Sequence, residues 1–298
     1  MTSMRISTSL MYQRGVNAIE SQQVKLSKTE QQLATGERLS SPADDPFAST
    51  RIVALEEEKT LLDQYNRNSD YAMTRLQQEE TALTSAINAL QRLRELAVQT
   101  ANGIYSAEDR RTVSEEAYQI RDGLLQVANT TNEDGEYIFS GNRMDTPAYD
   151  NAYNYQGDQG QRFIQIGKSR QVETADSGYV VFENVPGAVG GNVMQIADSY
   201  AFELDVNGVQ DPNALDDIDA AINHLATIRS RIGGRVNAIE SEKGANDSFS
   251  ESIQKNKSTL KDLDYAEAIS RFNQELAGLQ AAQQSFIKIQ NLSLFNYI

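Results

Sequence analysis

The sequence predicts a mainly α-helical protein with a small inserted β-rich domain, in which the N- and C-terminal segments form a long helical-bundle or coiled-coil rod. Two observations lead to this fold class. Apolar residues recur every seven positions near both ends of the chain, which is the repeat of a coiled coil. Between residues 142 and 212 this repeat gives way to glycines, tyrosines and short strand-like runs.

The first helix is expected from about Ser7 to Thr35. Gly36 then ends it, because glycine readily takes the left-handed backbone conformation that follows a helix. The polar run from Gly36 to Pro46 holds two prolines and is expected to be a turn-rich connector. The seven-residue repeat of this helix consists of Tyr12, Ile19, Leu26 and Leu33.

The second helix is expected from Pro46 to about Gln99. The Asp45 carboxylate can accept hydrogen bonds from the first backbone amides, and proline at the first helical position lacks an N–H that would have no partner there. Ser69 interrupts the apolar repeat and is expected to face solvent, the alternative being a polar residue within the stripe that helps to set register or partner choice. The repeat consists of Leu55, Leu62, Leu76, Leu83, Leu90 and Ala97.

A third helix is expected over 107–130, because Ser106 can cap its first turn. Strand-like runs follow at 136–141, 162–166, 179–182 and 201–206, each bounded by glycine or another turn-forming residue. These runs predict the inserted β-rich domain.

Helical patterns return near Asn213 and continue to the C-terminus. In the returning helix Ile218, Leu225, Ile232 and Ile239 repeat by seven. In the last helix Tyr265, Phe272, Leu279 and Phe286 repeat by seven, and Ile269 and Leu276 fill the four-and-three spacing between the first three of them.

These patterns divide the chain into three nested domains. Residues 1–42 with 258–298 form a terminal coiled-coil assembly domain, 43–141 with 213–257 form a helical rod, and 142–212 form the insert. The terminal stripes have nothing local to pack against, so they are expected to pair with each other and with neighbouring subunits. Short helices with narrow apolar stripes are marginal alone in water, so both ends are expected to order on assembly.

Composition excludes several classes of partner. The chain has 298 residues and a formal net charge of −15, which disfavours binding to nucleic acid or to an anionic membrane surface. It has no cysteine, hence no disulfide or thiolate chemistry. No transmembrane stretch and no secretory signal peptide is expected, so composition alone suggests a cytosolic protein.

No catalytic, cofactor-binding or metal-binding residues are expected. His224 is the single histidine, and the Asp44–Asp45 pair is explained by helix capping. The acidic residues Asp211, Asp216, Asp217 and Asp219 lack the spacing of a calcium-binding loop. No phosphate-binding glycine loop and no nucleophile–base arrangement is present. The chain is therefore predicted to be a structural protein and not an enzyme.

Three motifs resemble the bacterial flagellin family. They are the connector region Leu33–Pro46, the long-helix segment Leu90–Gln99, and Asp262–Ala268 at the start of the last helix. The resemblance covers about residues 1–140 and 215–298. The positions that match the family's motifs are Gly36, Arg38, Ser40, Asp44, Asp45, Gln91, Arg92 and Leu96.

Two kinds of family member fit the sequence, namely the filament flagellin and the protein of the junction between hook and filament. Three segments resemble the junction protein more closely: the opening Met4–Tyr12, the segment Gly135–Gly141 that leads into the insert, and the ending Leu292–Ile298. A coiled-coil adaptor outside the flagellum remains a further alternative, but it would not need the flagellin-type connector.

The resemblance implies a structural subunit of the extracellular flagellum, exported through the flagellar type III apparatus without a cleaved signal peptide. It would form a ring with copies of itself at the distal end of the hook. Its implied partners are the first hook-associated junction protein, flagellin, and a cytosolic chaperone that holds the C-terminal helix before export.

Overall fold

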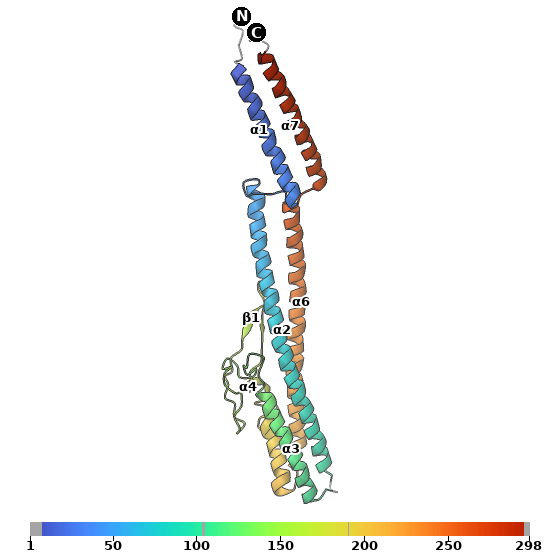
Figure 1. Ribbon diagram of the computed structural model, residues 1–298. Coiled ribbons are helices and arrows are strands. Elements are labelled where there is room, and N and C mark those ends of the chain that lie inside the picture. The colour runs from blue at the N-terminus through green and yellow to red at the C-terminus, as the bar shows by residue number, and fades with distance from the viewer. Residues whose placement is uncertain (1–7, 103–104, 190, 295–298) are drawn as a thin grey trace. The chain divides into compact units, whose positions relative to one another are not determined.

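The computed structural model describes residues 8–102, 105–189 and 191–294 (Figure 1). It is predominantly helical, which confirms the predicted fold class. Contacts divide the chain into two compact units, residues 1–60 with 249–298 (unit 1) and residues 61–248 (unit 2). The helices are α1 (Thr8–Thr35), α2 (Pro46–Thr100), α3 (Ala107–Ala128), α4 (Gly178–Val181), α5 (Val193–Phe202), the π-helical turn η1 (Glu203–Asn207), α6 (Ala214–Lys261) and α7 (Tyr265–Leu294).

The predicted helix ends are confirmed, because the expected residues cap them. Gly36 takes a left-handed φ of +72° directly after α1. The Asp45 carboxylate accepts a hydrogen bond from the Ala48 amide at 3.0 Å in the first turn of α2. Ser106 and Asp109 form a reciprocal capping box at the start of α3.

The core of unit 2 is built on the predicted seven-residue repeats. Leu76, Leu83 and Leu90 of α2 are fully buried, and so are Ile218, Leu225, Ile232 and Ile239 of α6. In Figure 1 these helices lie side by side with α3. The prediction that Ser69 faces solvent is wrong: Ser69 is fully buried, and its hydroxyl donates to the Tyr65 carbonyl at 2.9 Å. This internal hydrogen bond lets serine stay inside the apolar repeat.

The insert contains one short antiparallel sheet, β1 (Phe163–Gln165) with β2 (Gln171–Glu173), in which Ile164 pairs with Val172. The strand predicted at 162–166 is therefore confirmed. The other three are wrong: 179–182 falls on and just after α4, 201–206 continues α5 into η1, and 136–141 contributes a single bridge from Tyr137 to Thr131. Burial decides the outcome, because Val181, Phe182, Ala201 and Leu204 enter one core together.

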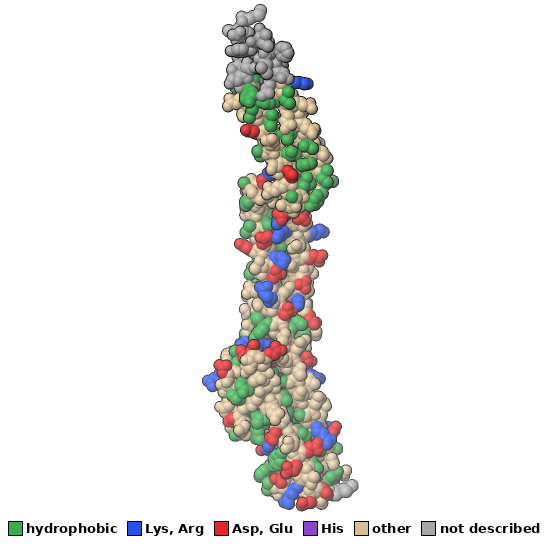
Figure 2. Space-filling model, in the orientation of Figure 1, with side chains coloured by type: hydrophobic (Ala, Val, Ile, Leu, Met, Phe, Trp, Pro, Cys, Tyr) green, Lys and Arg blue, Asp and Glu red, His purple; other side chains and the backbone are tan. Residues whose placement is uncertain are grey.

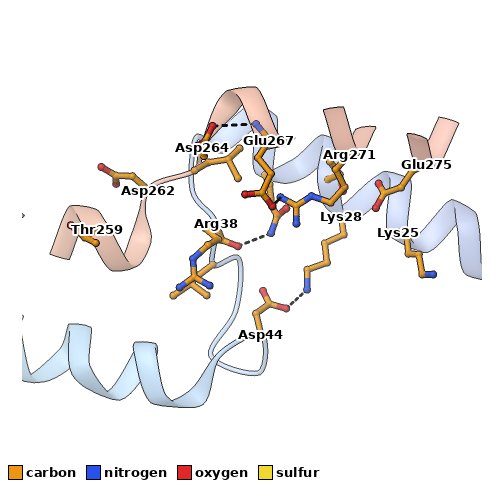
Figure 3. Close-up of a pocket in the computed structure, with 14 residues that line it drawn as sticks. Lys25, Lys28, Arg38, Asp44, Thr259, Asp262, Asp264, Glu267, Arg271 and Glu275 are labelled. Atoms are coloured by element: carbon orange, nitrogen blue, oxygen red, sulfur yellow. Dashed lines mark hydrogen bonds and ion pairs between the residues drawn. The ribbon is translucent and has the colours of Figure 1, made fainter. Parts of the chain in front are cut away.

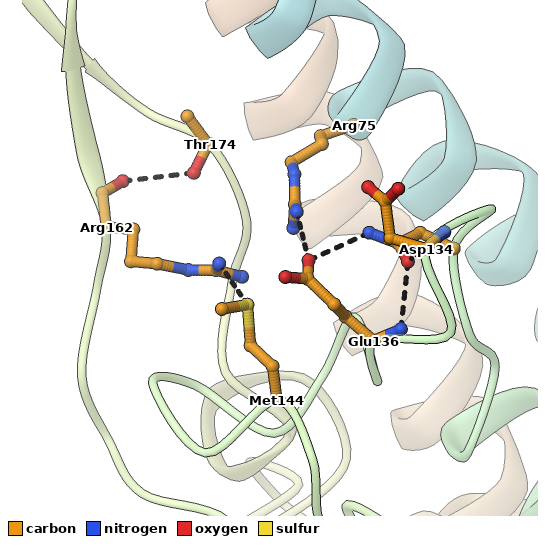
Figure 4. Close-up of polar contacts among 7 residues, drawn as sticks. Arg75, Asp134, Glu136, Met144, Arg162 and Thr174 are labelled. Atoms are coloured by element: carbon orange, nitrogen blue, oxygen red, sulfur yellow. Dashed lines mark hydrogen bonds and ion pairs between the residues drawn. The ribbon is translucent and has the colours of Figure 1, made fainter.

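Aromatic and polar contacts hold the segment 136–139, which leads into the insert, against the insert and against α2. The rings of Phe139 and Phe182 pack edge to face with centroids 5.1 Å apart. The buried guanidinium of Arg75 pairs with the Glu136 carboxylate, which also accepts from the Asn132 side chain at 2.9 Å (Figure 4). These contacts tie the turn after α3 to α2.

Two buried carboxylates meet where the insert contacts α2 and α6. Glu79 and Asp176 are each 1% exposed, and the Asp176 amide donates to the Glu79 carboxylate at 3.2 Å. Arg235 of α6 pairs with Asp176 at 2.8 Å and with Glu173 at 2.5 Å. Burial, and then the Asp176 charge, raise the pKa of Glu79 well above its ordinary value of 4.5.

No helix among the described residues is both long enough and apolar enough to span a bilayer. His224, the single histidine, is half-buried and its Nε2 lies 3.1 Å from the Val180 carbonyl oxygen. It therefore contributes to the packing of α6 against α4.

The buried Glu79 makes the stability of unit 2 depend on pH. Because the folded pKa lies above the unfolded one, this group's contribution is complete below pH 4.5 and is lost as the pH rises toward the folded pKa. Glu79→Gln keeps an acceptor for the Asp176 amide but has no proton to lose. Urea denaturation should therefore give the variant an unfolding midpoint above wild type by an amount that grows with pH.

Glu115→Gln is the matched control, because Glu115 is solvent-exposed on α3 of the same unit. Its midpoint should follow wild type at every pH. A constant difference between Glu79→Gln and wild type across the pH range would contradict the assignment.

Candidate assembly interface

The two ends of the chain pair as antiparallel helices within unit 1. Helices α1 and α7 contact each other along their described lengths and lie side by side in Figure 1. Tyr12 of α1 and Phe286 of α7 meet with ring centroids 5.0 Å apart. A Cβ on Gly15 would come within 2.7 Å of the Phe286 ring, so glycine at this position lets the ring approach the α1 backbone.

The ten apolar residues predicted at the interface separate into two groups. Six are half-buried: Ile19, Leu26, Leu33, Phe272, Leu279 and Phe286. The remaining four are more exposed: Tyr12 at 49%, Tyr265 at 52%, Ile269 at 51% and Leu276 at 36%. The pairing of α1 with α7 therefore uses only part of the predicted apolar surface.

The exposed apolar residues of α7 form a second stripe, which we call the outer stripe: Tyr265, Ile269, Leu276 and Ile287. Their spacings of four, seven and eleven residues place them on one side of a helix. At ~100° per residue, this side lies about a quarter turn from the face that packs on α1. Figure 2 shows apolar side chains gathered over these helices. Sequence reasoning missed Ile287, whose eleven-residue spacing from Leu276 was the available signal.

Small and polar side chains also take part in the contact between α1 and α7, beside the six half-buried apolar residues. Thr29 is 3% exposed and Ala268 is fully buried. Gly278 lies opposite Gln22: a Cβ added at position 278 would be 3.4 Å from the side-chain nitrogen of Gln22. Because the large apolar residues between α1 and α7 are only half-buried, this pair contributes less hydrophobic stabilisation than the fully buried Leu- and Ile-rich core of unit 2.

The connector between α1 and α2 pairs with the turn between α6 and α7. The Arg38 amide donates to the Lys261 carbonyl at 2.8 Å, and the Leu263 amide donates to the Gly36 carbonyl at 3.0 Å. The Arg38 guanidinium donates to the Leu260 carbonyl at 2.8 Å, while the Gln32 side chain donates to the Arg38 carbonyl at 2.6 Å (Figure 3).

Asp44 organises the rest of the connector. Its carboxylate accepts from the amides of Ser40 and Ser41 at 3.1 Å each, and it pairs with Lys28 of α1 at 2.5 Å. The hydrogen bond from Lys28, followed by that from the Ser41 amide, lowers the pKa of Asp44 below its ordinary value of 3.8. The family-motif positions Gly36, Arg38, Ser40, Asp44 and Asp45 therefore fold one connection.

A cavity of about 610 Å³ lies beside this connection, between α1, the connector and the start of α7. Charged residues of both signs line it, among them Lys25, Arg38, Glu267 and Arg271 (Figure 3). Their mixed charge gives the cavity no strong preference for an anion or a cation.

The motif residues of the long helix have structural positions in unit 2. Leu96 is 1% exposed, within the core. Arg92 donates to Glu116 of α3 at 2.7 Å and to Glu95 at 2.9 Å, and these contacts raise its pKa. Gln91 is exposed beside it. Within the described residues, no group of three His, Asp or Glu side chains is placed to hold a metal ion.

Comparisons with known proteins agree with the motifs. Residues 6–144 match the bacterial flagellin N-terminal helical region, and residues 215–298 match the bacterial flagellin C-terminal helical region. The chain is 28% identical to flagellar hook-associated protein 3 of Salmonella typhimurium, over 98% of this chain and 99% of that protein. It is 24% identical to a flagellin of Listeria monocytogenes, over 90% of this chain and 89% of that protein.

A solved structure shares the fold. A protein described as a flagellar hook-associated protein from Vibrio parahaemolyticus superposes with a TM-score of 0.67 at 26% identity, covering 74% of this chain and all of that one.

Gly36 tolerates substitution poorly, because its backbone is left-handed and an added Cβ would lie close to the Tyr265 hydroxyl. Gly36→Ala forces a Cβ into the left-handed conformation and brings it within 2.8 Å of the Tyr265 hydroxyl. We expect a loss of about 1–2 kcal/mol in local stability. Amide hydrogen exchange in α1 and α7 should become faster, with exchange in α3 unchanged.

Gly135→Ala is the matched control, because Gly135 also has a positive φ but has no atom within 4 Å of its Cβ position. It should leave exchange in α1 and α7 at the wild-type rate. If amides of α1 and α7 exchanged at the wild-type rate in Gly36→Ala as well, the connector would not be what holds the two ends together.

Proposed function

The chain belongs to the bacterial flagellin family, and we propose that it is a structural, non-enzymatic subunit of the extracellular flagellum that forms the junction ring between hook and filament. It then seeds the assembly of flagellin. The observation that carries this proposal is the outer stripe, an apolar surface that the chain's own α1–α7 pair leaves exposed.

The junction role is favoured over filament flagellin by the extent of the similarity. The match to hook-associated protein 3 spans nearly the whole of both chains, whereas the match to the Listeria flagellin is lower in identity and in coverage. The opening and ending segments that resemble the junction protein lie largely outside the described residues.

Assembly buries the outer stripe against neighbouring subunits. Four apolar side chains on one side of α7 suit a helix-in-groove or coiled-coil contact. Head-to-tail contacts of this type produce rings or helical tubes, according to whether the rotation closes. Because α1 and α7 already pair within the single chain, assembly in this proposal covers the outer stripe of an existing helix pair.

Three kinds of partner follow. Copies of the chain form the ring, with the first hook-associated junction protein on the hook side and flagellin on the filament side. Before export, a cytosolic chaperone covers the C-terminal helix. In this scheme the terminal domain, 1–42 with 258–298, supplies the contacts between subunits. The rod, 43–141 with 213–257, supports that domain, and the insert, 142–212, is a surface domain.

Electron microscopy tests the role directly. Hook fragments that carry the first junction protein are incubated with this chain under flagellin-polymerising conditions, and flagellin is then added. The junction role predicts a short cap that stops growing by itself and then accepts flagellin. Long filaments made of this chain alone would make it a filament flagellin.

Substitutions separate pairing within the chain from contact between subunits. Leu279→Asp and Leu26→Asp place a charge between α1 and α7, so both should abolish cap formation while the body of residues 46–256 stays folded. Ile269→Asp lies on the outer stripe, where the side chain is 51% exposed. It should abolish cap formation without changing hydrogen exchange in α1.

Gln280→Asp is the control, because Gln280 is an exposed polar residue beside Leu279 on the same helix. It should form caps normally. If Ile269→Asp and Leu279→Asp both restored motility to cells lacking the protein, the terminal stripes would not be the assembly element.

A further inference from the structure

A hollow of about 450 Å³ opens on the insert within unit 2. Three short segments enclose it: the turn after Tyr149, helix α4 with the residues that follow it, and the start of α5. Tyr153 and Tyr155 pack against the core of unit 2 on one side, but Asp158, Gln159, Tyr179 and Gln195, which also line the hollow, belong neither to that core nor to the assembly interface.

Tyrosine rings form part of the wall of this hollow. Tyr155 and Tyr179 have ring centroids 6.1 Å apart, and Tyr149 backs Tyr155 at 5.4 Å. The single proton of the Tyr155 hydroxyl is shared between two acceptors, the Asp158 carbonyl at 2.6 Å and the Phe139 carbonyl at 3.1 Å, which fixes the orientation of the ring. Tyr179 is 36% exposed, so part of its ring faces solvent.

The backbone around the hollow is held in an unfavourable conformation. Tyr153, with φ of 63°, and Asn184, with φ of 48°, are the non-glycine residues of positive φ among those described. Tyr153 lines the hollow and Asn184 follows Glu183, which also lines it. Such strain persists where surrounding contacts enforce it, and it concentrates at binding sites.

One buried amide holds both strained segments. Asn192 is 2% exposed, and its side-chain NH₂ donates to the Tyr153 carbonyl at 2.8 Å and to the Glu183 carboxylate at 3.1 Å. The hollow is therefore shaped before any ligand arrives, which reduces the entropy lost on binding.

Polar groups complete the wall. The Asp158 Oδ1 accepts from the amides of Asn142 and Gly160, which lower the pKa of this carboxyl, so that it is ionised at neutral pH. Its Oδ2 has no hydrogen-bond partner among the described residues. Amides of Gln159 and Gln195 also line the hollow, and no Lys, Arg or His does.

We propose that this hollow binds a neutral sugar ring. Tyrosine faces pack against the apolar C–H face of a pyranose, and sugar hydroxyls both donate to carboxylates and accept from amide NH₂ groups. Arg143 and Arg162 lie near enough to Asp158 to lower its pKa, but the lining of the hollow itself carries two carboxylates and no cation, which disfavours acidic ligands. A cationic ligand would suit the carboxylates and rings but would leave the amide donors without acceptors. This site is independent of the role proposed for the chain ends.

The test uses saturation-transfer NMR on the full chain. The neutral probes are maltose, lactose and N,N′-diacetylchitobiose, and sialyllactose and choline are compared at the same millimolar concentration. The proposal predicts transfer to ring protons of at least one neutral sugar, with none to choline. Transfer to choline, stronger transfer to sialyllactose than to lactose, or transfer to none of the three neutral sugars would overturn it.

Variants locate the binding. Tyr179→Ala removes an exposed ring and should weaken binding about tenfold, and Gln159→Ala should weaken it by a smaller factor. Tyr71→Ala is the control, because Tyr71 is a 46% exposed tyrosine of the same unit that does not line the hollow. If Tyr179→Ala bound as tightly as Tyr71→Ala, with both helical by circular dichroism, the sugar would not occupy this hollow.

Discussion

The pairing of the chain ends depends on two backbone hydrogen bonds between segments more than 200 residues apart in sequence. Arg38 donates to the Lys261 carbonyl and Leu263 donates to the Gly36 carbonyl, so the connector and the α6–α7 turn form a small antiparallel bridge. A contact between two backbones does not depend on flexible side chains. It therefore fixes the register of the helices on either side of it, α1 and α7. Helix α1 ends just before this bridge and helix α7 begins just after it, so their pairing follows from its geometry.

The sequence motif of the connector is explained by this bridge. Gly36 supplies the left-handed turn, Arg38 binds the end of α6 through backbone and side chain, and Asp44 caps the loop amides. Each of these residues would be costly to replace for a local reason. The family resemblance therefore identified the connection, although the sequence alone could not show that Arg38 reaches Leu260, since 222 residues separate them.

Helices, caps and the inner repeats were predictable because each depends on neighbours within one or two turns. The insert was not, because its strand-like runs are short and their outcome depends on burial. Alternation over 201–206 suggested a strand, yet Leu204 is buried while Phe202 and Val206 are exposed, an arrangement that the helical path of α5 and η1 produces. The capping box formed by Asn192 and Gln195 at the start of α5 was a local signal in favour of helix.

The same limit applies to the apolar stripes of the two ends. A repeat of seven specifies that a residue lies on a stripe, but not whether the partner is the same chain or another one. Small residues resolve this point: Gly15, Thr29, Ala268 and Gly278 let α1 and α7 approach closely, and that approach leaves Ile269 and Leu276 facing outward. Burying an apolar side chain of this size contributes about 1.5–3 kcal/mol. The large apolar residues between α1 and α7 are only half-buried and those of the outer stripe are more exposed, so the pair gains further hydrophobic stabilisation when another helix covers the outer stripe.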